Sequence, residues 1–195
     1  GQPLRAWSLR RRWRTFSTFE LIESRETRYQ HVDVGEREGQ REIRLDGLLA
    51  ASFPQEEQSR RGAALLLTQH PRPRRVLVVG GGPGGLCQEL LRAGTVRVDY
   101  VEIDPGLIEL YARLLGPTLL APLRGERFAA FACDGRRFVQ DADRRPERLR
   151  AMAVGFGAEP SRRQPAAPYD VVLVNIGDPT SASLNRYYTR EFFRE

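Results

Sequence analysis

The distribution of hydrophobic and polar positions divides the chain near residue 54. Before that point, four short segments mix apolar with polar residues and are separated by turn residues such as Asp46-Gly47. Such segments between turn signals are typical of β-strands joined by hairpins. We expect a small antiparallel β unit over residues 15–54, preceded by a basic tail over residues 1–14. The predicted strands are residues 20–23, 29–34, 41–45 and 48–52.

Beyond residue 55 the pattern changes to alternating strands and helices. Continuous apolar runs such as Val76–Val79 are typical of strands buried on both faces of a parallel sheet. The stretches between these runs carry helix signals, for example Pro105 at a helix start. We therefore predict an α/β fold over residues 55–195, with a mostly parallel sheet and helices on both faces. The predicted strands are 76–79, 98–103, 128–132 and 169–175, and the predicted helices are 55–69, 86–93, 105–114 and a short one starting at 135.

Residues 141–168 interrupt this alternation. They are rich in Arg, Pro, Ala and Gly and have weak periodicity, so we interpret them as an inserted loop. The chain also stops soon after the fourth predicted strand of this part. Because a doubly wound sheet normally continues for two or three more strands, we expect a C-terminal truncation.

Composition narrows the class of protein. The 195 residues are 41% apolar and 29% charged, which excludes a wholly disordered chain. No apolar run approaches the ~18 residues of a transmembrane helix. The two cysteines, Cys87 and Cys133, lack metal-ligand spacing. We expect a cytoplasmic protein with free buried thiols, no metal site and no membrane span.

The positive charge is concentrated at the start of the chain. The formal charge is +6, from 31 basic and 25 acidic residues, and every basic residue is arginine. Residues 1–14 hold five arginines and no acid. This segment is interpreted as a solvated tail, with a membrane-surface segment or a nucleic-acid contact as alternatives. Because no recognisable nucleic-acid module follows, we expect no nucleic-acid partner.

A glycine-rich turn follows the first predicted parallel strand. Gly80, Gly82 and Gly85 satisfy G-x-G-x-x-G between a strand and a helix, where glycines permit a tight turn and close backbone approach to a ligand. Glu102 lies 20 residues beyond Gly82 at the end of the next strand, where a carboxylate accepts hydrogen bonds from both ribose hydroxyls. The pattern favours a nucleotide site, and the alternative is a glycine-rich turn without a ligand.

Two ligand classes fit this pattern, namely NAD and an adenosyl-sulfonium compound. The third predicted strand ends in Cys133-Asp134-Gly135. An acid there accepts from the amino group of adenine, and the glycine lets the ring approach. The alternative is that Asp134 only caps a helix. Taken together, Glu102 and Asp134 favour an adenosyl ligand such as S-adenosylmethionine or its decarboxylated form.

Further motifs occur in order along the chain. They are Tyr29-Gln30, Leu45–Gly47, His70–Leu77, Gly80–Gly85, Val101–Asp104, Asp134–Arg136, Tyr169–Val172, Asp178-Pro179 and Tyr188–Phe193. With these segments, the chain from about residue 29 to 193 resembles the polyamine aminopropyltransferases, the spermidine synthase family. The segment 178–185 is most similar to a bacterial branch fused to membrane helices, which would make the basic start a juxtamembrane segment and the chain the cytosolic part of a membrane-anchored protein.

The resemblance implies a Rossmann-like fold of the class I methyltransferase type and a specific chemistry. The family transfers an aminopropyl group from decarboxylated S-adenosylmethionine to an amine such as putrescine, and its members commonly form homo-oligomers. By resemblance, the ligand would be a substrate and not a tightly bound cofactor. Carried over by position, Gln30 would line the cofactor side, Glu102 would hold the ribose, Asp134 with Gly135 the adenine, and Asp178 would sit by the amine.

The chain departs from the family at the acceptor positions. Pro83 stands where the family has an Asp that holds the transferred group, and Asn175 stands where it has the Asp that serves as base. The segment 56–62 lacks the family's Tyr, His and last Glu, and it contains Arg60 and Arg61. An amide cannot accept a proton in this role. We therefore expect that the site for a cationic acceptor has lost the acids that bind and deprotonate it.

Four hypotheses follow. The first is an adenosyl-binding homologue whose aminopropyl transfer to polyamines is altered or lost. The second is an active spermidine synthase in which Asp178, Glu56 or Glu57 compensates. The third is a methyltransferase or NAD-dependent enzyme on the same scaffold. The fourth is an interaction module that binds no nucleotide.

Overall fold

The computed structural model describes residues 11–94, 97–156, 165, 168–177 and 182–194. The chain divides into two compact units, residues 1–55 and residues 56–195. Each unit has its own sheet, which differs from the other in strand direction. The two units are therefore described one at a time.

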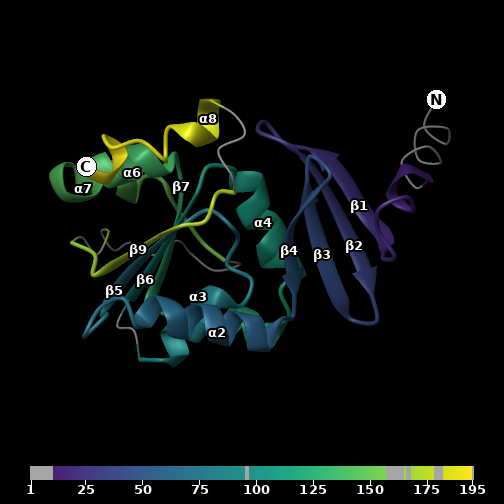
Figure 1. The fold of residues 1–195 in the computed structure, drawn as a ribbon, viewed down its shortest axis with the longest axis horizontal. Helices are drawn as coiled ribbons and strands as arrows, with labels where there is room; N and C mark the ends of the chain where they lie inside the picture. The colour runs from purple at the N-terminus through teal and green to yellow at the C-terminus, as the bar shows by residue number, and fades with distance from the viewer. Residues whose placement is uncertain (1–10, 95–96, 157–164, 166–167, 178–181, 195) are drawn as a thin grey trace. The chain divides into compact units, whose positions relative to one another are not determined.

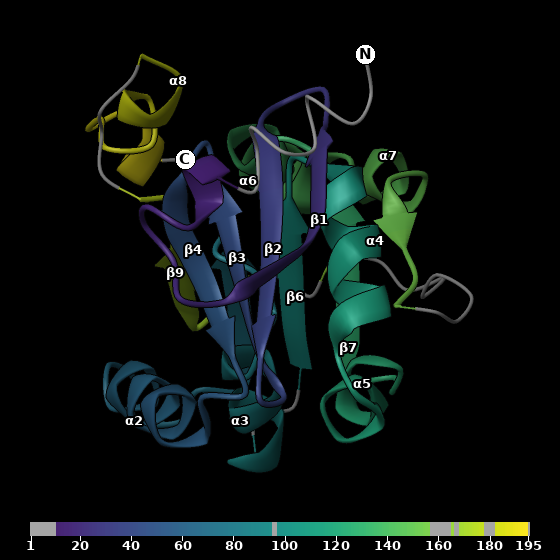
Figure 2. The same ribbon diagram turned by 90° about the vertical axis from the view of Figure 1, so that its right-hand side faces the viewer.

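The first unit contains a four-stranded antiparallel sheet with the strand order β1-β2-β3-β4 (Figures 1 and 2). Two of its hairpins close with residue pairs of positive φ, Glu38-Gly39 and Asp46-Gly47. Such pairs match the right-handed twist of the strands that they join. The predicted antiparallel unit is confirmed. The strands are β1 (Glu20–Glu26), β2 (His31–Arg37), β3 (Gln40–Leu45) and β4 (Leu48–Phe53).

Trp13 packs against strand β2 of this sheet. Its side chain is 2% exposed, and its indole nitrogen donates to the carbonyl of Phe19 at 2.6 Å. A Cβ on Gly35 would lie 2.5 Å from the Trp13 ring, so glycine in β2 makes room for the indole. Trp13 therefore packs on the sheet, although the sequence placed it in the basic tail. Residues 1–10 of that tail lie outside the described residues.

The second unit contains a five-stranded sheet with the order β8-β7-β6-β5-β9. Four strands pair in parallel, and only β8 is antiparallel. The predicted mostly parallel sheet is confirmed. The strands are β5 (Arg75–Val79), β6 (Arg97–Glu102), β7 (Phe128–Ala132), β8 (Ala153–Val154) and β9 (Val171–Val174).

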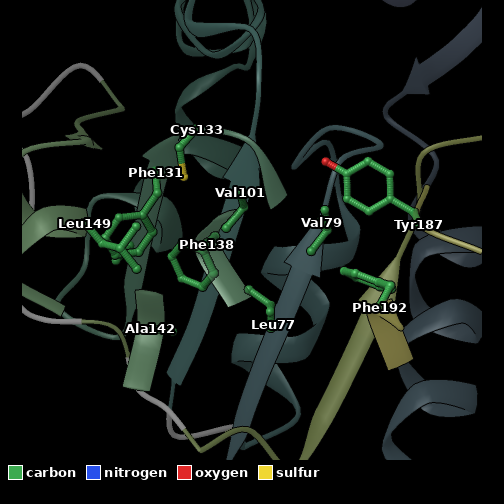
Figure 3. Packing of buried hydrophobic residues seen from close by; sticks show 11 residues of the cluster. Leu77, Val79, Val101, Phe131, Cys133, Phe138, Ala142, Leu149, Tyr187 and Phe192 are labelled. Carbon is green, nitrogen blue, oxygen red and sulfur yellow. The ribbon is translucent and has the colours of Figure 1, made fainter. Parts of the chain in front are cut away.

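Alternate residues of the parallel strands face opposite sides of the sheet, and helices cover both sides. Leu77, Val101 and Phe131 pack with Phe138 and Leu149 on one side (Figure 3). On the other side, α3 and α4 contact β6, and α5 contacts β7. The helices are α2 (Glu56–Leu67), α3 (Leu86–Arg92), α4 (Pro105–Leu114), α5 (Pro117–Leu123), α6 (Gly135–Arg144), α7 (Pro146–Arg150) and α8 (Ala182–Asn185), and a 3₁₀ helix spans Phe192–Arg194.

The predicted loop at 141–168 is wrong over its first half. Helix α6 continues to Arg144, α7 follows, and β8 pairs with β7. A narrow apolar stripe, which includes the buried Phe138, Ala142 and Leu149, packs these elements on the sheet in addition to the pairing of β8 with β7. Most of the neighbouring residues are charged, so the hydrophobic periodicity that would predict these helices is weak. Residues 157–164 and 166–167 lie outside the described residues.

Both cysteines are buried free thiols, as the sequence predicts. Burial raises the pKa of Cys87 and of Cys133 to about 12, so neither is a thiolate at neutral pH. Among the helices of the described residues, none has the length and apolar character needed to cross a bilayer.

Phe138 should be a main contributor to the stability of the second unit. Its side chain is 0% exposed and packs on Phe131 with ring centroids 5.0 Å apart. We expect Phe138→Ala to lower the free energy of unfolding by about 3–5 kcal/mol through lost burial and a residual cavity. Urea denaturation measures this change.

Phe193→Ala is the matched control, because Phe193 is 72% exposed. Its free energy of unfolding should stay within about 0.5 kcal/mol of the parent. An equal loss in the two variants would contradict the packing described for α6.

Candidate functional site

The register of the second sheet brings three strand ends into one row. Val79 of β5 pairs with Val101 of β6 on one side and with Val174 of β9 on the other. The next residues are Gly80, Glu102 and Asn175. Backbone hydrogen bonds continue past the ends of the strands, from Gly80 N to Val101 O at 2.8 Å and from Asn175 N to Val79 O at 2.8 Å.

This row lies at the point where the strand order reverses. The chain proceeds from β5 to β6 and β7 on one side and then returns to β9 on the other side of β5. In open parallel sheets, ligands bind beyond the carboxyl ends of the strands at such a switch point. The row is therefore the candidate site.

The glycine-rich loop after β5 is held by side chains of its own unit. Gly81 and Gly82 have φ of +76° and +74°, a region that favours glycine. A Cβ on Gly82 would overlap the hydroxyl of Tyr111 from α4, and a Cβ on Gly81 would overlap the Asn175 carboxamide. These glycines therefore allow the loop to pack on Tyr111 and Asn175, a role that the sequence motif alone does not specify.

Glu102 is a buried carboxyl group at the end of β6. It is 7% exposed and accepts hydrogen bonds from the Tyr100 hydroxyl at 3.2 Å and from Asp104 N at 3.1 Å. Burial raises the pKa of Glu102, although both of these hydrogen bonds act in the opposite direction. The pKa of Tyr111 is also raised, by burial and by the charge of Glu102. Glu102 and Tyr111 therefore share one partly desolvated environment.

Asp134 stands at the start of α6 and caps it. Its Oδ1 accepts from Arg137 N at 3.1 Å, and its Oδ2 accepts from the Tyr187 hydroxyl at 3.2 Å and from Arg186 Nη2. Gly135 N donates to the same Tyr187 hydroxyl at 3.1 Å. Tyr187 lies beside Val79 in Figure 3, and a Cβ on Gly135 would lie 2.5 Å from Val79 Cγ1. Asp134 is therefore both a helix cap and a neighbour of the β5 end.

The spermine/spermidine synthase domain family matches residues 63–195. The chain belongs to this family. Among curated proteins, it is 31% identical over 182 residues to the polyamine aminopropyltransferase of Pyrococcus abyssi, covering 91% of this chain and 58% of that protein. It is 29% identical over 172 residues to polyamine aminopropyltransferase 2 of Hyperthermus butylicus, covering 86% of this chain and 49% of that protein.

Solved structures support the fold of this spermine/spermidine synthase domain. A spermidine synthase in complex with the transition state analogue AdoDATO superposes with a TM-score of 0.66 at 21% identity, over 90% of this chain and 54% of that one. The spermidine synthase of Thermotoga maritima superposes with a TM-score of 0.64 at 21% identity, over 90% of this chain and 53% of that one. The chain spans about half the length of such relatives.

The structure places most of the predicted site residues at one edge of the family domain. Gln30 lies in the other unit, in the turn between β1 and β2, where its carbonyl accepts from Thr27 N at 2.9 Å. Asp178 lies outside the described residues. The residues at the carboxyl edge of the sheet are Gly80, Gly82, Gly85, Glu102, Asp134, Gly135 and Asn175.

Sequence reasoning missed three side chains at this edge. Tyr111 lies against the glycine loop, and Arg186 and Tyr187 contact Asp134. For Tyr111 the available signal was a tyrosine within an otherwise aliphatic buried stripe of a helix that follows Glu102. Arg186 and Tyr187 are about 50 residues away from Asp134 in the sequence, so no local pattern connects them.

The positions expected from the sequence to depart from the family carry neutral or positive residues. Pro83 is buried in the loop, and the Asn175 carboxamide lies against Gly81. Arg60 and Arg61 are exposed on α2, where Arg61 forms an ion pair with Glu57 one turn earlier. Among the described residues of the strand-end row itself, Glu102 is the only acid.

The raised pKa of Glu102 predicts a pH dependence of stability. A carboxyl group whose pKa is higher in the folded state stabilises the fold below its unfolded pKa, and this contribution is lost as the pH rises through the folded pKa. We therefore expect the free energy of unfolding of Glu102→Gln, relative to the parent, to increase from pH 4.5 to pH 7.5. Urea denaturation at the two pH values measures the difference.

Asp170→Asn provides a control of opposite sign. Backbone N–H groups of Arg75 and Arg74 lower the pKa of Asp170. Its stabilising contribution is present above the unfolded pKa and is lost as the pH falls. Relative to the parent, the Asn variant should therefore lose stability as the pH rises through the range below 3.8, the ordinary pKa of the group, and stay nearly constant from pH 4.5 to pH 7.5. If the free energy of unfolding of Asp170→Asn, relative to the parent, also increased from pH 4.5 to pH 7.5, this would contradict the assignment for Glu102.

Proposed function

We propose that this domain binds an adenosyl-sulfonium ligand, such as decarboxylated S-adenosylmethionine or S-adenosylmethionine, or the product methylthioadenosine. We further propose that its transfer of an aminopropyl group to polyamines is altered or lost. The observation that carries both parts is the row at the strand ends, where Glu102 is a buried carboxyl and Asn175, against the glycine loop, is an amide.

The nucleoside half of the proposal rests on two acids and a shaped loop. Glu102 at the end of β6 would accept from the ribose hydroxyls, and Asp134 at the end of β7 would accept from the adenine amino group. The loop over Gly80–Gly85 is already packed on Tyr111 and Asn175. A spermidine synthase of the same fold is known in complex with AdoDATO, which supports this class of ligand. By the family resemblance, Gln30 is proposed as a residue that contacts the adenosyl ligand.

The acceptor half of the proposal follows from what the reaction needs. An amine attacks the carbon next to the sulfonium, the carbon–sulfur bond breaks, methylthioadenosine leaves, and the amine loses a proton to a base. Asn175 offers an amide, which cannot take this proton. Pro83 offers no charge for the ammonium end of the transferred group. Each missing charge pair is worth up to about 4 kcal/mol at contact in an effective dielectric near 20, before desolvation.

An active polyamine aminopropyltransferase is the second candidate function. The observation in its favour is that the curated relatives bear this name across 85–91% of the present chain. Asp178 would then serve as the base, with Glu56 or Glu57 attracting the amine. Glu57 already forms an ion pair with Arg61, which reduces its attraction for a cation.

A ligand panel distinguishes these candidates. Calorimetry should show binding of methylthioadenosine or an adenosyl-sulfonium compound and no binding of NAD, because Glu102 and Asp134 taken together favour an adenosyl ligand over a dinucleotide. An assay of spermidine formation from putrescine should give no more than trace product. Rapid turnover would overturn the acceptor half and support the second candidate. Binding of NAD alone would favour a dehydrogenase, and absence of all binding would overturn the nucleoside half.

Restoring the acids should restore attraction for polyamines. The double variant Pro83→Asp with Asn175→Asp adds two charges at the loop and should bind putrescine at least tenfold more tightly than the parent, measured by calorimetry with methylthioadenosine present. The matched control is Pro71→Asp with Asn185→Asp, which adds the same charge at two exposed positions. Equal putrescine binding in both double variants would contradict the electrostatic argument.

A further inference from the structure

The carboxylate of Asp134 is already occupied by three donors. They are the backbone N of Arg137, the hydroxyl of Tyr187 and the Nη2 of Arg186. An ionised carboxylate has about four acceptor positions in total. Among the described residues Oδ1 has a single donor, which leaves a position on that oxygen, and the Asp134 side chain remains 23% exposed. One further donor can therefore reach this group.

Two consecutive residues from far along the chain hold this carboxylate. The Arg186 guanidinium forms the ion pair with Asp134 and lies over the Tyr187 ring, 5.1 Å from its centroid. The Tyr187 hydroxyl accepts from Gly135 N and donates to Asp134, so it links the acid to the start of α6. The arginine compensates the charge of Asp134, and the arginine and the tyrosine together fix the orientation of its carboxylate.

Arg186 is not held in place by a complete set of its own hydrogen bonds. Its Nε is buried and has no hydrogen-bond partner within the described residues. A buried donor without a partner is unfavourable. The ion pair with Asp134 and the contact with the Tyr187 ring therefore keep the guanidinium at this position, so Arg186 and Asp134 act as one unit.

We infer that Arg186 is a positioning residue that sets the nucleobase preference of this site. It holds Asp134 as an oriented carboxylate that only accepts hydrogen bonds, so that its remaining position takes the 6-amino group of a purine and rejects a 6-oxo group. This inference rests on the proposed function, because it assigns the purine to Asp134.

The physical reason is the match between donors and acceptors. A 6-amino group donates to the Asp134 carboxylate. A 6-oxo oxygen only accepts, so it would face a carboxylate oxygen that also only accepts and that Arg186 prevents from rotating away. Without Arg186, the carboxylate is free to turn, so it no longer presents a fixed acceptor to the 6-position of the purine. Loss of the arginine should therefore weaken discrimination more than it weakens nucleoside binding in general.

The test compares methylthioadenosine with methylthioinosine on the full chain at pH 7. Calorimetry should show that the parent prefers the adenine compound and that Arg186→Gln reduces this preference about tenfold. Arg186→Lys, which keeps the charge but not the planar fork, should give an intermediate ratio. The control is Arg190→Gln, an exposed arginine of the same segment, which should keep the parental ratio.

A double-mutant cycle separates this role from a structural one. In the Asp134→Asn background, Arg186→Gln should leave the ratio unchanged, because the group that it positions is gone. Thermal melting of each variant shows whether it remains folded. If Arg186→Gln does not fold, the comparison of Arg186→Lys with the parent carries the test.

Three results would overturn the inference. The first is an unchanged ratio in Arg186→Gln and Arg186→Lys while the parent binds methylthioadenosine, which leaves the proposed function intact. The second is tighter methylthioadenosine binding in Arg186→Gln, which would show that the arginine competes with the ligand for Asp134. The third is a parent that binds neither nucleoside, in which case the proposed function fails as well.

Discussion

The parallel pairing of β5 with β6 on one side and β9 on the other is the constraint on which the site depends. Its register places Gly80, Glu102 and Asn175 directly after three paired valines. A shift of one residue would move every side chain of a strand to the other face of the sheet. The glycine loop, the buried acid and the amide therefore occupy one edge because the hydrophobic strands before them fit in only one way.

The two carboxyl groups at this edge of the sheet, Glu102 and Asp134, differ in burial and in how their charge is compensated. The carboxyl of Glu102 is buried, and burial raises its pKa although its neutral hydrogen-bond donors act in the opposite direction. Asp134 is more exposed and is compensated by Arg186. A ligand with hydroxyl donors would replace lost hydration at Glu102, since hydrogen bonds favour the charged form of a carboxyl group. The site is therefore suited to a ligand that brings donors to both acids.

The loop that would face such a ligand is shaped in advance. Gly81 packs on Asn175, which directly follows β9, and Gly82 packs on Tyr111 of α4, so a Cβ at either glycine would collide. Preorganisation of this kind reduces the ordering that binding must otherwise provide. It also connects the loop to Asn175, so this residue supports the loop in addition to its proposed place in the acceptor pocket.

Much of the fold could be predicted from the sequence because its signals are local. The hairpin turn at Asp46-Gly47, the apolar run Val76–Val79 and the proline at the start of α4 each specify their own segment. The candidate acids could be predicted in the same way, as Glu102 and Asp134 end apolar runs. In contrast, α7 and β8 were missed, since their burial depends on one narrow stripe against the sheet.

The sequence by itself determined the two patterns of strands, the glycine loop and the two acids at the strand ends, because each follows from neighbouring residues. Only the tertiary structure decided that Trp13 packs on the first sheet, that Tyr111 lies against Gly82 and that Arg186 pairs with Asp134. These contacts join positions that are distant in the chain. They are set by which faces the packed sheet and helices bring together, and no periodicity along the chain records that information.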